Sequence, residues 1–294
     1  MLLLTGATGL VGSALLRLLL AEEQPVRCLV RDPRRLGPQR VQVQIALGDL
    51  TDPPSFRNAM RGVSTVVHLA SATRDQPRGS IEELTAMATW RMVDAAQRVG
   101  VERFVYFSLL GASEHHRSRL FRSKAIAERA VGNAELRSTI VAPSLVYAPG
   151  DRWLTLVARL ARLPVLPIPG RGRAVCQPIW AQDLAACTLA ILRSDEQQPA
   201  AHERYELAGP QTLTYDEVLR AILHSLHSER PLLHVPKPIA SRALRALERT
   251  MGANTPLTWE EAELIQADMV SDRGMADAES LGVTPQPIPT VLDG

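Results

Sequence analysis

Short apolar runs alternate with amphipathic stretches through the first half of the chain. Six apolar runs predict buried strands: Leu2–Thr5, Pro25–Val30, Val41–Leu47, Val63–Ala70, Arg103–Ser108 and Ser138–Val146. Stretches with helical spacing lie between them: Ser13–Glu22, Ile81–Val99, Ser118–Val131 and one that begins at Asp52 and Pro53. Strands separated by helices are typical of a parallel sheet wound on both faces. The pattern therefore predicts an α/β fold with a doubly wound parallel sheet.

After residue 150 the pattern changes. Residues 162–180 are rich in proline, glycine and arginine, which favours an ordered loop over a cleft. The helical segment 181–194 is expected to return to the first lobe. We expect a first domain over residues 1–150 and a smaller, interleaved lobe over residues 151–294.

Three glycines lie between the first predicted strand and its following helix, in the sequence LLLTGATGLVGSALL. At such a turn Gly6 permits a tight bend, Gly9 lets the backbone approach a pyrophosphate, and Gly12 lets the helix pack against the sheet. The N–H groups and dipole at the helix start favour an anion. The alternative is a structural turn that needs small residues. The first interpretation predicts a dinucleotide site in a Rossmann sheet, contacted by Thr5, Gly6, Thr8, Gly9, Leu10, Val11 and Gly12.

The residues after the second strand usually select the cofactor. A carboxylate there binds the ribose 2′-hydroxyl of NAD, while an arginine accommodates the 2′-phosphate of NADP. Arg31 follows the strand directly, and Asp32 comes one residue late. Arg34 and Arg35 are close behind. This order favours NADP over NAD, the alternative being arginines that are only solvated loop residues.

Two further strand ends are expected to border the same site. Asp49 and Leu50, in the sequence GDL, follow the third strand and are placed to meet an adenine, with Asp49 as acceptor for its amino group. Ala70 and Ser71 follow the fourth strand and are expected to line the path of the cofactor.

Composition and charge limit the classes of partner. Hydrophobic residues make up 46% of the 294 residues and charged residues 22%, as in globular proteins. The formal net charge of +2 gives no general attraction to nucleic acid. The three widely spaced cysteines favour a reducing compartment, and no apolar run reaches the roughly 20 residues that span a bilayer. We expect a cytoplasmic protein with no transmembrane segment and no nucleic-acid partner.

Motifs along most of the chain resemble those of the extended and atypical short-chain dehydrogenase/reductases. They are TGATGLVG, GDL, VVHLA, VERFVYFSLLGAS, RSKAIAE, APSLVYAPGD, QPIWAQDLA and YELAGPQTLTYDEVL. The last three are similar to the branch that contains the nucleotide-binding accessory subunit of respiratory complex I. NmrA-like and isoflavone-reductase-like proteins are neighbouring branches. The resemblance implies a Rossmann fold, NAD(P) binding and oxidoreductase chemistry.

In the active family pattern, a tyrosine transfers the carbonyl proton and a lysine lowers its pKa while binding the nicotinamide ribose. Lys124 matches that lysine, but Leu120 stands where the tyrosine belongs. Ser108 is the candidate for the family's catalytic hydroxyl, although Leu110 is the position usually aligned with it. Thr85 stands where many relatives have an asparagine. The resemblance therefore implies a complete cofactor site with an altered proton relay.

Three roles are open for Lys124. It binds the ribose hydroxyls as a fixed cation, or it is itself the acid/base group, as in the isoflavone-reductase-like branch. The third alternative is a solvated lysine that pairs with Glu128 at i+4.

Other groups could supply the proton. His115 and His116 precede the helix of Lys124, in the loop expected to border the substrate, and titrate near neutral pH unless they are merely exposed. Tyr147 ends the sixth strand beside the expected nicotinamide site, the alternative being a residue packed at the sheet edge. Outside this region, Gln177 is a polar candidate over the cleft.

The second lobe offers few other candidates. Arg171–Arg173 either clamp an anionic substrate or form a solvated turn. Asp183 is expected to cap or pin the helix that follows it. His224 and His227 stand at i, i+3 without a third ligand, so no metal site is expected.

The sequence thus favours an NAD(P)-binding oxidoreductase of a small organic substrate, with Lys124, a histidine or water as proton donor. The alternative is a non-catalytic NAD(P)-binding regulatory or assembly protein, with a homo-oligomer or a protein complex as its context. A nucleotide-sugar epimerase ranks third, because that reaction depends on the missing tyrosine.

Overall fold

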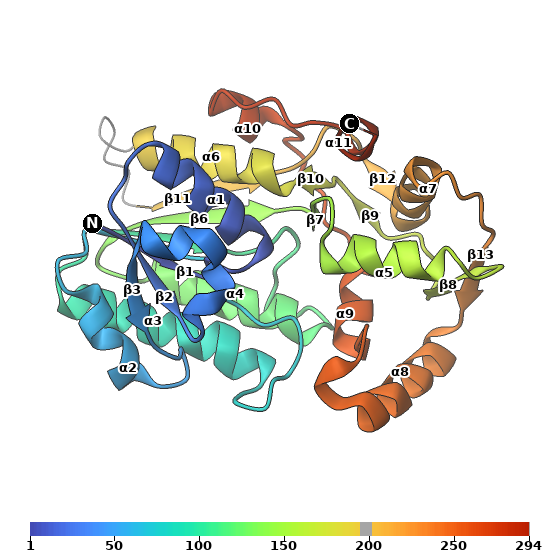
Figure 1. The fold of residues 1–294 in the computed structure, drawn as a ribbon, viewed down its shortest axis with the longest axis horizontal. Helices are drawn as coiled ribbons and strands as arrows, with labels where there is room; N and C mark the ends of the chain where they lie inside the picture. The colour runs from blue at the N-terminus through green and yellow to red at the C-terminus, as the bar shows by residue number, and fades with distance from the viewer. Residues whose placement is uncertain (195–201, 294) are drawn as a thin grey trace.

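The computed structural model describes residues 1–194 and 202–293, and its centre is a parallel sheet of seven strands (Figure 1). Their order is β11-β6-β5-β4-β1-β2-β3. The strands are β1 (Leu2–Thr5), β2 (Val26–Val30), β3 (Gln44–Leu47), β4 (Thr65–His68), β5 (Arg103–Phe107), β6 (Arg137–Pro143) and β11 (His202–Leu207). All neighbouring pairs are parallel. The predicted doubly wound sheet is confirmed.

Helices cover both faces of this sheet. On one face lie α1 (Leu10–Ala21), α6 (Ala181–Ser194) and α10 (Ala276–Ser280). On the other lie α2 (Pro53–Arg57), η2 (Asn58–Met60), α3 (Ala88–Arg98) and α4 (Arg119–Gly132). The leucines of α1 pack against α6, as Leu15 and Leu19 share a core with Leu184. The segment 181–194 therefore lies against the first half of the chain.

Two predicted elements differ in detail from the structure. The helix expected over Ile81–Val99 begins with a π-helical turn, η3 (Glu83–Met87), before α3. The strand expected from Val41 begins at Gln44, and its apolar side chains are mostly exposed. β3 is the edge strand of the sheet, so fewer neighbours cover it than cover the central strands.

The second half of the chain builds a smaller core beside the sheet. Its strands pair in twos: β7 (Val146–Tyr147) with β10 (Ile179–Trp180), β9 (Val175–Cys176) with β12 (Leu213–Thr214), and β8 (Leu166–Pro169) with β13 (Leu232–Val235). Its helices are α5 (Arg152–Leu160), α7 (Tyr215–Ser225), α8 (Lys237–Met251), η4 (Gly252–Asn254), α9 (Trp259–Leu264) and α11 (Ile288–Leu292). Figure 1 shows α8 and α9 projecting as an arm. Within the described residues, no helix is long and apolar enough to cross a membrane.

Candidate functional site

The glycine turn between β1 and α1 places the start of the helix at the carboxyl end of β1. Gly6 has a φ of +74°, a conformation that favours glycine. A Cβ on Gly12 would lie 2.1 Å from the carbonyl oxygen of Gly6, so only glycine fits there. The first turn of α1 follows at Leu10 and Val11, whose N–H groups precede the first intrahelical hydrogen bonds. The turn therefore presents backbone donors to an anion.

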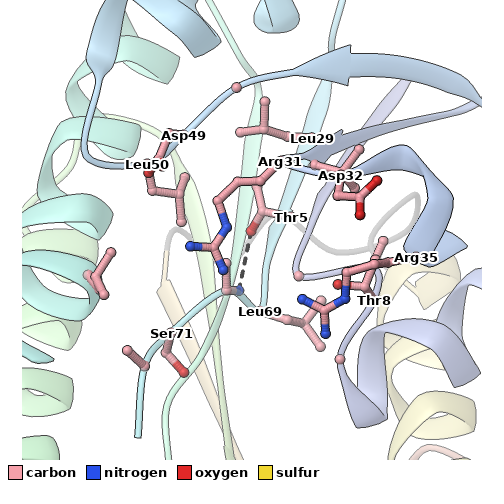
Figure 2. A pocket seen from close by; sticks show the side chains of 18 of the residues that line it. Thr5, Thr8, Leu29, Arg31, Asp32, Arg35, Asp49, Leu50, Leu69 and Ser71 are labelled. Atoms are coloured by element: carbon pink, nitrogen blue, oxygen red, sulfur yellow. Dashed lines mark hydrogen bonds between the residues drawn. The ribbon is translucent and has the colours of Figure 1, made fainter. Parts of the chain in front are cut away.

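A cavity of about 500 Å³ opens in front of this turn (Figure 2). The ends of β1, β2, β3 and β4 form its walls, as the carboxyl ends of parallel strands do in dinucleotide sites. The residues expected at the cofactor that line it are Thr5, Gly6, Thr8, Gly9, Arg31, Asp49, Leu50, Ala70 and Ser71. Leu10, Val11 and Gly12 lie in the adjoining turn of α1.

Two arginines supply the positive charge of the cavity. Arg31 and Arg35 both line it, and Figure 2 shows their guanidinium groups directed inward. Asp32 lines the cavity as well, and its carboxylate accepts a hydrogen bond of 3.0 Å from the backbone N–H of Arg34. Asp32 thereby caps η1 (Pro33–Val41), the short helix that carries Arg35.

Asp49, which follows β3, is a hydrogen-bond acceptor in the wall of the cavity. Its carboxylate accepts hydrogen bonds from the N–H and the hydroxyl of Thr51 at 3.0 and 2.9 Å. It also forms an ion pair with Arg78 at 3.2 Å. Burial raises the pKa of Asp49, but these hydrogen bonds and the charge of Arg31 outweigh it and lower the pKa overall. Arg31 also donates to Gln76 at 3.0 Å. The turn around residues 76–79 is thus tied to the rim from both sides.

A hydrogen-bond chain through His68 supports the floor of the cavity. Thr89 donates its hydroxyl proton to the carbonyl of Thr85 (2.7 Å), so its oxygen accepts from Nε2 of His68 (3.2 Å). Nδ1 of His68 then accepts from Thr5 (2.8 Å), whose oxygen accepts the N–H of Ala70 (3.3 Å). Burial, reinforced by the charge of Lys124, lowers the pKa of His68 to about 3 and keeps it neutral.

Sequence reasoning missed this role of His68. The available signal was one ionisable residue at the end of an otherwise apolar strand, in the motif VVHLA. A buried histidine without partners is costly, so such a position indicates a hydrogen-bond network.

Lys124 is buried on α4 and does not line the cavity. Its side chain lies among core residues, the residue is 4% exposed, and Nζ donates a hydrogen bond of 2.6 Å to the carbonyl of Phe107. The ammonium lies 5.1 Å from the ring centre of Tyr106. Burial lowers the pKa of Lys124 to about 7, although the charge of Glu128 opposes the shift. Because Lys124 is buried, the expected alternative of a solvated lysine is wrong, and Glu128 forms its ion pair with Arg204 at 2.6 Å.

The candidate hydroxyl groups for the proton relay are buried as well. Leu120 lies one turn before Lys124 and is 4% exposed. Ser108, Tyr106 and Tyr147 are also buried, and the hydroxyl groups of Ser108 and Tyr147 have no hydrogen-bond partner within the described residues. Burial raises the pKa of both tyrosines, which keeps their phenols protonated. Tyr147 lies in β7, beyond the end of β6.

The two histidines before α4 lie in a different hollow. His115 and His116 line it together with Lys237 and Trp259 of the second lobe. The ring of His116 stacks on Phe121, with ring centres 4.2 Å apart. Burial, helped by the charge of Arg122, lowers the pKa of His116.

Gln177 and Asp183 hold distant segments in place. Gln177 accepts from the N–H of Ser271 (2.7 Å) and donates to Thr212 (3.2 Å). Asp183, in the first turn of α6, accepts from the N–H of Gln286 at 2.8 Å. Both therefore pin the C-terminal segment to the body of the protein.

Known proteins are similar to this chain in sequence. A family model described as NAD(P)H-binding matches residues 6–156. A mitochondrial NADH dehydrogenase [ubiquinone] 1 alpha subcomplex subunit 9 from Dictyostelium discoideum is 27% identical, over 96% of this chain and 80% of that protein. A ceramide reductase from Caulobacter vibrioides is 29% identical, over 80% of this chain and 73% of that protein.

Solved structures agree on the fold. A nucleoside-diphosphate-sugar epimerase from Staphylococcus aureus superposes with a TM-score of 0.77 at 18% identity, covering 100% of this chain and 99% of that chain. A UDP-glucose 4-epimerase from Thermus thermophilus, in complex with NAD, gives a TM-score of 0.72 at 18% identity, over 99% and 97% of the two chains. The glycine turn, the cavity and these relatives agree: the chain belongs to the NAD(P)H-binding family, among the atypical short-chain dehydrogenase/reductases.

Proposed function

We propose that the protein is an oxidoreductase of a small organic substrate that binds NADP(H) in preference to NAD(H). The observation that carries the cofactor preference is the charge arrangement at the end of β2. Arg31, Asp32 and Arg35 all line the cavity, and the carboxylate of Asp32 also caps η1. Guanidinium groups suit a 2′-phosphate, and the two arginines outnumber the single carboxylate at this wall.

The remaining walls fit the other parts of such a cofactor. The turn at Gly6 and Gly9, with the start of α1, would hold the pyrophosphate through backbone N–H groups. Asp49, kept ionised by Thr51, would accept from the adenine amino group. The bound cofactor would supply or accept the hydride.

Lys124 is the group that we assign to the proton, although it is buried in the core and is not part of the cavity lining. Its pKa of about 7 lets it hold or release a proton near neutral pH, the range in which a general acid or base is most effective. The carbonyl of Phe107 fixes the position of Nζ. Leu120 contributes only hydrocarbon one turn away, so α4 supplies no phenol at that position.

The cofactor preference can be measured by calorimetric titration. We expect Arg31→Ala to weaken NADPH binding by about tenfold or more, the loss of one charge-assisted hydrogen bond, and to leave NADH binding nearly unchanged. Arg34→Ala is the matched control, because Arg34 is a neighbouring exposed arginine that does not line the cavity. Equal losses for NADPH and NADH would contradict the assignment.

The assignment of Lys124 needs turnover as well as binding. With NADPH and a panel of carbonyl and quinone substrates, Lys124→Met should lower kcat by about 100-fold or more and leave the Kd for NADPH within a few-fold of wild type. A variant that retains wild-type kcat would show that another group transfers the proton.

A second candidate function is a non-catalytic NAD(P)-binding subunit of a protein complex. The buried Leu120 favours it, as do relatives named as subunits of NADH dehydrogenase. It predicts tight cofactor binding without NADPH oxidation across the panel, and the same Kd for NADPH in Lys124→Met.

A further inference from the structure

A hollow in the second lobe brings a turn with two arginines together with a lysine that is distant in the sequence. Arg171, Arg173 and Lys237 line a hollow of about 780 Å³. Lys237 and Gln266 also line the smaller hollow of His115 and His116, so the two hollows adjoin. None of these six residues lines the dinucleotide cavity.

The turn that carries the two arginines has a defined shape. Gly170 and Gly172 have φ values of +90° and +63°, and a Cβ on Gly172 would overlap the carboxylate of Asp216. The N–H of Gly170 donates to Val235 at 2.8 Å, and the carbonyl of Gly172 accepts from the N–H of Asp216 at 3.0 Å. The backbone is thus held on both sides, and the alternative of a loose solvated turn does not describe it. The two arginines project from a rigid support.

The three cations have no anionic partner of their own. Across residues 1–194 and 202–293, no carboxylate forms an ion pair with Arg171, Arg173 or Lys237. Asp216 of α7, whose carboxylate lies against Gly172, pairs with Nε2 of His234 at 2.9 Å. Arginines at the lobe contact behave differently, since Arg74 pairs with a glutamate. A concave surface lined by one sign of charge attracts the opposite charge.

Beside the cations, the hollow offers apolar walls. Pro236, Pro238 and Ile265 line it, and Trp259 borders the adjoining hollow. Guanidinium groups bind phosphate and carboxylate through paired hydrogen bonds. A ligand that satisfies both features carries an anionic group at one end and an apolar body at the other.

We propose that this hollow is a second binding site, which takes an organic anion with an apolar chain. Its phosphate or carboxylate group meets Arg171, Arg173 and Lys237, and its chain lies on Pro236, Pro238 and Ile265. The site is separate from the dinucleotide cavity and does not depend on hydride transfer.

The test is calorimetric titration of the whole chain with octyl phosphate, octanoate and 1-octanol. We expect octyl phosphate or octanoate to bind at least about tenfold more tightly than 1-octanol, and the tighter of the two anions identifies the head group. The double variant Arg171→Ala, Arg173→Ala should lose about tenfold or more in affinity for that anion while its Kd for NADPH stays unchanged. The matched control Arg57→Ala, Arg162→Ala removes two exposed arginines that line neither hollow.

Two results would overturn the inference. One is 1-octanol binding as tightly as both anions, which would leave no role for the charge. The other is an unchanged anion affinity in the double variant. Failure of NADPH to bind, with octyl phosphate still bound through the arginines, would refute the proposed function and leave this site standing.

Discussion

Lys124 lies one turn after Leu120 on α4, and both side chains are buried. The helical spacing of the two residues follows from the sequence alone. The pKa of Lys124, in contrast, depends on desolvation by groups from β5 and α4. A residue with an ordinary charge in the unfolded chain therefore becomes a group that titrates near neutrality.

The burial of Lys124 predicts a pH dependence of stability. Because the folded state lowers the pKa from 10.5 to about 7, the native protein binds fewer protons than the unfolded chain between these values. The contribution of Lys124 to the free energy of unfolding is most unfavourable below pH 7. It becomes less unfavourable as the pH rises toward 10.5. The free energy of unfolding of Lys124→Met minus that of wild type should therefore be larger at pH 6 than at pH 9.

Urea denaturation at the two pH values measures this difference. Lys237→Met is the control, since Lys237 is the other lysine of the chain and is exposed. A stability difference between Lys124→Met and wild type that is the same at both pH values would mean that the ammonium is not buried in solution.

At the scale of elements, two helices begin at the dinucleotide cavity. α1 follows its capping residue Gly9 and offers backbone donors, while η1 follows its capping residue Asp32 and carries Arg35. The two starts have different roles because of their caps. Gly9 supplies no side-chain cap, whereas the carboxylate of Asp32 binds the N–H of Arg34.

The role of Asp32 as a cap predicts a mild effect of Asp32→Asn. Asparagine is as good a cap as aspartate, so the melting temperature and the Kd values for NADPH and NADH should change little, by less than about threefold for binding. Asp32→Ala should cost about 1 kcal/mol of stability through loss of the cap. If Asp32→Asn instead weakened NADH binding by tenfold, Asp32 would be a ribose ligand.

At the scale of the whole molecule, an ion-pair network joins the two halves of the chain. Glu261 of α9 binds Arg74 at 2.8 Å, and its own exposure and that of Arg74 are only 16% and 14%. Arg152 lies 3.7 Å from the same carboxylate. Arg119, at the start of α4, pairs with Asp75 at 2.8 Å. The network therefore ties the loop after β4 to the second lobe.

Loss of this network should loosen the second lobe. We expect Glu261→Ala to lower the free energy of unfolding by roughly 2–3 kcal/mol, because it leaves the mostly buried Arg74 without its carboxylate partner. Asp94→Ala, which removes the exposed Asp94–Arg98 pair of α3, should cost less than about 0.5 kcal/mol. Chemical denaturation compares the two. Equal small costs would show that the lobes hold together by apolar contacts alone.

Much of the sheet was predictable because its signals are local. Apolar runs separated by helices located six strands of the sheet, and the glycine turn located one wall of the cavity. β11 was missed, since its sequence HERYEL is largely polar and it pairs with β6 across 64 residues of chain. The roles of His68 and of Asp32 as a cap also escaped, because they depend on which groups lie opposite them.

The sequence by itself determined the order of strands and helices and the glycine turn, because backbone sterics and apolar spacing act within a few residues. It also placed Leu120 one turn before Lys124. Only the tertiary structure decided that Lys124 is buried and that Arg31 and Arg35 face one cavity. It alone brought Arg171 beside Lys237, because desolvation and charge act between residues that only folding brings together.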